Sequence, residues 1–271
     1  MQCIPNGNDM KETDLNNLLE CAVCAVKAAG THALANYSRR HEIAKASDDD
    51  IKLLLDIECQ DKIFKIIQSA FPSHDILGEE GCLDATGNGF RWIVDPLDGT
   101  VNFSHGLPIW CSSVAVQLNG KTLAGAVYAP ALNQCYTATN EAKSLCNGDP
   151  IHTSLVQNPE GAMVLTGFPK QMKYDKSAKM LFDDLLAHTQ RTRIYGAAAL
   201  DTCFVAAGSA DAYIESGLYI WDIAAGMLIV KQAGGDAGII KNMPNDRLTF
   251  LAANKTLFTQ LKNFYKRNTA S

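Results

Sequence analysis

The chain has 271 residues, of which 47% are hydrophobic and 20% charged, and its formal net charge is −5. A chain of this length and composition is not expected to be disordered and can bury a large core, either as one domain or as two closely packed halves. Because the chain is modestly acidic and has no long basic run, nucleic acids and anionic membrane surfaces are not expected as partners.

The nine cysteines predict neither a disulfide framework nor a zinc site, because their number is odd and their spacing irregular. The single Cys-x-x-Cys, Cys21 to Cys24, lies in an apolar helical run, where both thiols are expected to pack against a helix face. Reduced thiols favour a cytoplasmic protein. The N-terminal segment lacks the apolar centre of a signal peptide, and we find no run of about 18 apolar residues, so we expect a soluble protein that is not exported and has no membrane partner.

The first half of the chain predicts two helices followed by an antiparallel sheet. Thr13 can cap a helix that runs to Tyr37, and residues 48–50 begin a second helix that Pro72 ends. The segment between them has no apolar period and is expected to form an exposed loop that carries Lys45 and could fold over a site. Strands are expected at 74–77, 90–94, 112–118, 122–128 and 133–139, the last three as a meander.

From Met163 onward, strand and helix patterns alternate. Helices are expected at 175–188, 198–207 and 221–232 and at the end of the chain, with short strands between them. No repeat or low-complexity linker separates the halves. We predict one domain over 1–271, with an N-terminal α+β subdomain (1–150), a C-terminal α/β subdomain (151–271) and a site at their seam.

The stretch from Trp92 to Phe103, W-I-V-D-P-L-D-G-T-V-N-F, carries most of the chemistry. Asp95 and Asp98 follow an apolar strand and flank Pro96, and Gly99 comes next, so we expect the backbone to leave the strand and turn there. Carboxylates suit hard cations, and the free amides at the start of a following helix suit a phosphate. The stretch therefore indicates metal-assisted phosphate chemistry.

The segment D-P-L-D-G-T-V-N-F resembles the metal-binding signature of the inositol monophosphatase family, which comprises magnesium-dependent, lithium-sensitive phosphomonoesterases. G-E-E at 78–80 and W-D-I-A-A-G at 221–226 also match, as does the substrate-side G-A-A-A-L-D at 196–201. The resemblance extends from Asp14 to the last helix. It implies a five-layered αβαβα sandwich, Mg²⁺ as cofactor, a small phosphomonoester as substrate and a homodimer.

The same resemblance implies the roles of individual residues. The expected metal ligands are Glu79, Asp95, the carbonyl of Leu97, Asp98 and Asp222, with a weaker role for Glu80. Glu79 would also contact the attacking water. Asp56 would lie against Thr100 and help its hydroxyl to orient and deprotonate that water, although a surface-facing helix acid is the alternative for Asp56. Capping of a helix explains Asp222 equally well, and both roles can coexist.

On the substrate side, the resemblance implies contacts from Gly99 and Thr100 to the phosphate and from Gly196, Ala197, Ala198 and Glu215 to a polyol. Two positions depart from the family. Relatives usually carry Ser or Thr where this chain has Ala197, and many bacterial members have a second arginine where Ile194 follows Arg193. Arg193 could still bind a phosphate or carboxylate.

The expected reaction is hydrolysis of inositol 1-phosphate or a similar sugar or polyol phosphate by metal-activated water. The alternatives within the superfamily are phosphatases for fructose 1,6-bisphosphate, histidinol phosphate or 3′-phosphoadenosine 5′-phosphate. Val101 and Asn102 favour the inositol or fructose branch. A non-catalytic regulatory protein with the same fold is the alternative from another class. No G-x-S-x-G motif supports a serine hydrolase, and His105 is expected to be a loop residue.

Overall fold

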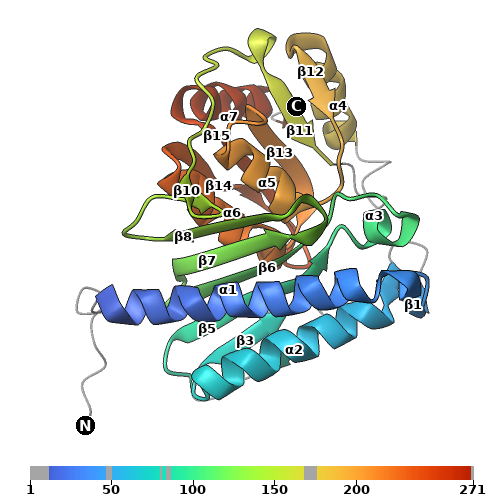
Figure 1. Cartoon of the computed structure of the whole chain (residues 1–271). Coiled ribbons are helices and arrows are strands. Elements are labelled where there is room, and N and C mark those ends of the chain that lie inside the picture. Colours follow the sequence, from blue (N-terminus) through green and yellow to red (C-terminus); the bar gives the residue numbers. More distant parts are fainter. Residues whose placement is uncertain (1–11, 47–50, 80, 84–86, 168–175, 270–271) are drawn as a thin grey trace.

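Helices and sheets alternate in five layers, in the order α, β, α, β, α, in the computed structural model of the chain (Figure 1). The structure describes residues 12–46, 51–79, 81–83, 87–167 and 176–269. The predicted αβαβα sandwich is therefore confirmed. Three pairs of helices form the α layers: α1 (Glu12–Ala35) with α2 (Leu54–Ala70), α5 (Ala198–Ala206) with α6 (Ile220–Gln232), and α4 (Lys176–His188) with α7 (Lys255–Thr269).

The first β layer is an eight-stranded sheet in the order β10-β9-β8-β7-β6-β5-β3-β4. Its strands are β3 (Asp75–Gly78), β4 (Gly81–Leu83), β5 (Phe90–Asp98), β6 (Cys111–Leu118), β7 (Lys121–Ala129), β8 (Gln134–Thr139), β9 (Leu145–Cys146) and β10 (Asp149–Pro150). The predicted meander corresponds to β6, β7 and β8. The sheet is not wholly antiparallel as expected, because β3 and β5 pair in parallel.

The second β layer is a five-stranded mixed sheet in the order β12-β11-β13-β15-β14. Its strands are β11 (Met163–Thr166), β12 (Arg191–Arg193), β13 (Ala212–Leu218), β14 (Gly235–Asn242) and β15 (Leu248–Asn254). Strand β11 pairs in parallel with both β12 and β13. All strands of the first sheet precede residue 151 and all strands of the second follow it, but the division into subdomains at that boundary remains a prediction.

Apolar residues form three buried clusters between the layers. One buried cluster lies under α1 and α2 and includes Ile63 and Trp92. A second fills the space between the sheets, around α5 and α6, and the third lies beneath α4 and α7. The middle cluster matters for function because it fixes α5 against the first sheet.

Among the described residues, one helix, α1 over Asp14–Ala35, is long and apolar enough to span a membrane by length and composition alone. In this fold, however, α1 packs against the eight-stranded sheet. Its residues Leu18, Ala25 and Ala29 belong to the core. The apolar character of α1 is therefore explained by packing within the protein.

Two local predictions were wrong between α1 and α2. The expected loop contains a short antiparallel hairpin of β1 (Ile43–Ala46) and β2 (Ile51–Leu53), in which Lys45 is opposite Lys52. Helix α2 begins at Leu54 rather than at the acidic residues 48–50, which lie outside the described residues. The carboxylate of Asp56 explains the later start, because its Oδ2 accepts the amide of Leu53 at 2.6 Å and closes the first turn.

Candidate active site

The D-P-L-D part of the segment is a bulged strand end, so the turn that the sequence predicts comes only at Gly99. Asp95 pairs with Ser113 and Asp98 with Cys111, so β5 has one more residue than β6 between these pairs. Pro96 lies in the bulge, and its carbonyl accepts the Ser112 hydroxyl at 2.7 Å. The bulge buries Asp95, Leu97 and Asp98, which brings two carboxylates and a carbonyl to one end of β5.

Gly99 makes the change of direction after β5. Its φ of 84° is left-handed, and α3 (Thr100–His105) follows directly. A Cβ at this position would lie 2.8 Å from the Ile109 carbonyl oxygen and 3.1 Å from the Cβ of Ala197. The predicted metal segment and the predicted substrate segment therefore touch at Gly99, and no larger residue fits there.

Asp98 accepts the first backbone amides of α5. Its Oδ1 accepts the amide of Ala198 at 3.0 Å, and its Oδ2 accepts those of Ala199 at 2.9 Å and Leu200 at 3.3 Å. Residue 197 is in the N-cap position, but alanine has no side-chain acceptor. Asp98 therefore replaces the missing cap from a different layer of the fold.

Four acidic residues lie close enough to Asp95 for their charges to act on it. Burial raises the pKa of Asp95 well above its ordinary value, and the charges of Glu79, Asp98, Asp222 and Asp56 raise it further. Burial likewise raises the pKa of Asp98 to about 6, although hydrogen bonds from Cys111 and from the α5 amides oppose the shift. The fold thus brings together five of the acidic residues that the sequence singles out.

Asp222 caps its own helix as predicted, since its Oδ2 accepts the amide of Tyr219 at 2.7 Å. Burial raises the pKa of Asp222 to about 8 against this hydrogen bond, and the charges of Asp98 and Glu215 add to the shift. Glu79 is exposed at the end of β3, where its amide donates to the carbonyl of Val94 at 3.1 Å. Glu80 lies outside the described residues.

Thr100 donates its hydroxyl to the Leu97 carbonyl at 2.9 Å. The expected pairing of Asp56 with Thr100 stays a prediction. Asp56 is buried, which argues against the alternative that it is a surface-facing helix acid. Its Oδ2 is occupied by the amide of Leu53.

A hard cation fits these residues by the chemistry of their donors. All of the candidate ligands are oxygens, and crowded carboxylates that raise one another's pKa are stabilised by a bound divalent ion. Among the residues that the structure describes, however, no three His, Cys, Asp or Glu side chains are grouped as a metal site. Asp95, Asp98 and Asp222 each accept at least one backbone amide in this arrangement.

The substrate-side residues lie next to Gly99 and α3. The side-chain amide of Asn102 donates to the carbonyl of Tyr195 at 2.6 Å and to that of Ile109 at 2.8 Å, which ties α3 to the segment before Gly196. Ala197 is buried against Gly99, so the side chain of a serine at this position would also lie next to Gly99. Arg193 and His105 are exposed, and His105 is the last residue of α3 rather than the loop residue that was expected.

Glu215 lies on β13, where the hydroxyl of Tyr213 donates to its Oε2 at 2.8 Å. Burial raises the pKa of Glu215 to about 7, opposed by the Tyr213 hydrogen bond and reinforced by the charge of Asp98. Glu215 is therefore close enough to Asp98 for the charges of the two carboxylates to interact.

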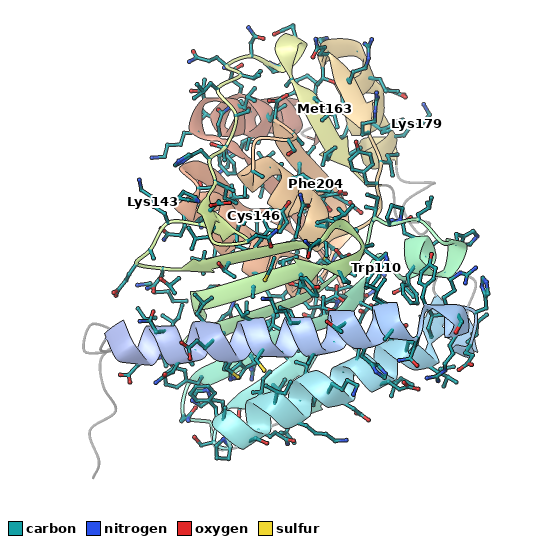
Figure 2. All side chains as sticks on the ribbon, in the orientation of Figure 1. Trp110, Lys143, Cys146, Met163, Lys179 and Phe204 are labelled. Carbon is teal, nitrogen blue, oxygen red and sulfur yellow. The ribbon has the colours of Figure 1, made fainter. Side chains whose placement is uncertain are left out.

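Sequence reasoning assigned no role in this site to four residues that lie in it or beside it: Asn102, Cys111, Asp201 and Tyr213. Cys111 is buried and its thiol donates to Oδ2 of Asp98 at 3.4 Å. Asp201 is fully buried on α5, and burial together with the charges of Asp98 and Glu215 raises its pKa well above the ordinary range. Only Tyr213 had a usable signal, because residues i and i+2 of a strand share a face. Trp110, labelled in Figure 2, makes an edge-on contact with Phe103 of α3, with ring centroids 4.9 Å apart.

Comparison with known proteins identifies relatives over most of the chain. The chain is 36% identical to Nus factor SuhB of Pasteurella multocida over 225 residues, which cover 82% of the chain and 84% of the relative. It is 33% identical to an inositol monophosphatase of Dictyostelium discoideum over 237 residues, covering 83% and 86%.

Solved structures are similar over almost the whole fold. The extragenic suppressor protein suhB of Bartonella henselae superposes with a TM-score of 0.85 at 29% identity, covering 91% of this chain and 97% of that one. The Thermotoga maritima IMPase superposes with a TM-score of 0.82 at 30% identity, covering 93% and 98%. The model of the inositol monophosphatase family matches residues 14–261, and the chain belongs to that family.

Proposed function

We propose that the protein is a Mg²⁺-dependent phosphomonoesterase that hydrolyses a sugar or polyol phosphate, with inositol 1-phosphate as the preferred substrate. The observation that carries the proposal is the crowding of carboxyl groups around Asp95, whose pKa is raised by burial and by the charges of Glu79, Asp98 and Asp222. Such crowding destabilises the protein unless a cation offsets it. Membership of a phosphatase family supports the same reaction class.

Glu79, Asp95, Asp98, Asp222 and the carbonyl of Leu97 would hold the Mg²⁺, since hard oxygen donors suit that ion. When bound, the ion would supply Lewis-acid stabilisation of the developing charge and lower the pKa of the attacking water.

The other residues of the site bind and orient the reactants. Thr100 already donates its proton to Leu97, so its oxygen can accept a hydrogen bond from a water and aim it at phosphorus, with Asp56 assisting. The backbone at Gly99 and Thr100 would bind the phosphate oxygens. Gly196 to Ala198 would lie against the polyol ring, and Glu215 would accept hydrogen bonds from ring hydroxyls.

The alternative substrates, those of other phosphatases of the superfamily, are fructose 1,6-bisphosphate, histidinol phosphate and 3′-phosphoadenosine 5′-phosphate. A binding protein without catalysis is the rival from another class, and it is favoured by the similarity to relatives that are named Nus factors. The two classes differ in a simple measurement, because only the enzyme releases inorganic phosphate.

The test is a phosphate-release assay on these substrates with Mg²⁺ and with EDTA. Asp95→Asn is the inactive variant. Asp183→Asn is its matched control, because the Asp183 side chain is exposed on α4, far from β5 in the chain, and pairs only with Lys179 among the ion pairs described. We expect release from inositol 1-phosphate that requires Mg²⁺, is inhibited by Li⁺ and disappears only in Asp95→Asn. Equal activity of both variants would exclude the proposed site. A cytoplasmic location and a homodimer complete the proposal.

A further inference from the structure

Two neighbouring residues fix where the carboxylate of Glu215 lies on the substrate side. The first is Tyr213, which lies two residues earlier on β13 and therefore on the same face of the strand. The Tyr213 side chain is fully buried, and its hydroxyl donates to Oε2 of Glu215 at 2.8 Å. This hydrogen bond occupies one carboxylate oxygen and leaves Oε1 as the acceptor for a ligand.

The second neighbour is Gly167, which follows the last residue of β11. Strand β11 runs parallel to β13 with Thr166 opposite Ile214, so the next step of the register places Gly167 beside Glu215. The Thr166 hydroxyl donates to the Ile214 carbonyl at 2.7 Å and fixes that register. A Cβ on Gly167 would overlap both oxygens and the carboxyl carbon of Glu215. The carboxylate therefore lies in the space that the missing side chain leaves.

We propose that Tyr213 and Gly167 determine substrate specificity as positioning residues: the tyrosine fixes Oε2 of Glu215, and the glycine leaves room for the carboxylate, so that Oε1 faces the ring hydroxyls of a polyol phosphate. This inference rests on the proposed function, because it assigns Glu215 to the substrate. The electrostatics are consistent, since Glu215 acts on the pKa of Asp222 and Asp98 acts on that of Glu215. A carboxylate so close to the acidic cluster can reach a molecule whose phosphate is bound there.

The chain offers matched controls for both positions. Tyr136 is also buried in the core between the sheets, and its hydroxyl donates to Oε1 of Gln134 at 2.9 Å, on β8 of the other sheet. Tyr136→Phe therefore removes a comparable buried hydroxyl that does not contact Glu215. Gly238 of β14 has only a ring carbon of Phe258 at 4.0 Å from a built Cβ, so Gly238→Ala is tolerated by packing.

The experiment measures kcat and KM of Tyr213→Phe and Gly167→Ala with inositol 1-phosphate and with p-nitrophenyl phosphate, which has no ring hydroxyls to recognise. We expect Tyr213→Phe to raise KM for inositol 1-phosphate by about threefold to tenfold, the effect of one hydrogen bond, and to change KM for the aryl phosphate by less than about twofold. Gly167→Ala should act in the same direction and more strongly. Tyr136→Phe and Gly238→Ala should leave the ratio of the two substrates unchanged.

A double-mutant cycle separates positioning from stability. If Tyr213 acts through Glu215, Tyr213→Phe has no further effect on selectivity in a Glu215→Gln background. Equal slowing of both substrates, or additive effects in the cycle, would overturn the inference. Thermal unfolding of each variant verifies that the folded protein is compared.

Calorimetric binding of free inositol to the Mg²⁺-loaded protein provides a readout that does not depend on hydrolysis. Weaker binding in Tyr213→Phe than in Tyr136→Phe supports the inference even if no phosphate is released, in which case only the proposed catalysis is wrong. Equal binding by both variants contradicts it. If the wild type hydrolyses inositol 1-phosphate and Tyr213→Phe has the same selectivity as the wild type, the proposed function stands and the inference is wrong.

Discussion

Asp98 and Ala199 are 101 residues apart in the chain and are joined by a hydrogen bond of 2.9 Å from the Ala199 amide to Oδ2 of Asp98. With the amides of Ala198 and Leu200, this contact makes one carboxylate both a proposed metal ligand and the cap of α5. Metal binding and the position of the substrate segment are therefore expected to depend on each other.

Replacement of Asp95 and Asp98 by asparagine should have different effects on stability. The Asp95→Asn side chain can keep the acceptor that receives the Leu97 amide at 3.1 Å while the change removes a buried, repelled charge, so this variant without metal should be at least as stable as wild type. The Asp98→Asn side chain has one carbonyl oxygen where the aspartate uses two. We expect Asp98→Asn to unfold at a free energy about 1 to 3 kcal/mol below that of Asp95→Asn in urea titrations with EDTA. Equal stabilities would show that the α5 amides do not need Asp98.

Ala197→Ser should compensate for a loss of Asp98. Serine in the N-cap position can accept the amides of the second and third helical residues, which are among those that Asp98 accepts here. In an Asp98→Asn background we expect Ala197→Ser to add about 0.5 to 2 kcal/mol to the free energy of unfolding, and less in the wild type. The check is a double-mutant cycle in urea. A gain of the same size in both backgrounds would contradict shared capping.

Mg²⁺ should stabilise the protein independently of turnover. An ion that binds only the folded state raises stability by about 2.7 kcal/mol at one hundred times its dissociation constant, and relief of the repulsion around Asp95 provides the reason for binding. We expect the unfolding temperature of the wild type to rise with Mg²⁺ concentration and that of Asp95→Asn to stay nearly constant. Asp183→Asn serves as the control, and a rise of the same size in Asp95→Asn would place the ion elsewhere.

His74 should make the fold sensitive to mild acid. Its ring is stacked on Phe90 with centroids 4.3 Å apart, and its Nδ1 accepts the indole N–H of Trp92 at 3.0 Å, so the neutral ring is the form that the fold binds. Burial lowers the pKa of His74 to about 4, although the charge of Asp75 opposes the shift. The unfolded chain then takes up a proton at higher pH than the folded one, so stability falls as the pH drops from 6.5 to 4.

We expect His74 to contribute a loss of about 2 kcal/mol across that range. Urea unfolding at several pH values measures it, with His74→Gln as the comparison. The variant should be less stable at pH 7 and lose less on acidification. Parallel curves for the two proteins would mean that another group titrates. Glu58, whose pKa is lowered from 4.5 to about 2 chiefly by its hydrogen bond from Arg39, contributes a loss of stability only below about pH 4.5.

Local sequence patterns predicted the helices and strands well wherever buried apolar residues recur at a regular spacing along the chain. The apolar spacing that marks α5, α6 and the strands β6 to β8 follows directly from burial on one or both sides. The β1–β2 hairpin escaped because Ile43, where it begins, is exposed, and an exposed strand carries no regular apolar pattern. The strand through Pro96 escaped because a bulge depends on the neighbouring strand, which a local pattern does not contain.

The candidate site was predicted as a set of residues but not as a set of contacts. Motif similarity singled out Asp98, Glu215 and the segment at Gly196, whereas the cap that Asp98 gives to α5 required the fold. A capping residue normally belongs to its own helix, so no spacing rule connects Asp98 with Ala199. Gly167 was missed for the same reason, since its role depends on the register of β11 and β13.

The bond between Asp98 and α5 also bears on how the protein is made. During synthesis Asp98 emerges about a hundred residues before the amides that it accepts, and closing so long a loop is a slow, entropically unfavourable event. Helices and the first sheet can form earlier, while Asp98 still lacks these partners. In refolding experiments, affinity for Mg²⁺ should therefore return later than the far-ultraviolet signal of secondary structure, because the site matures only when the two ends of this contact meet.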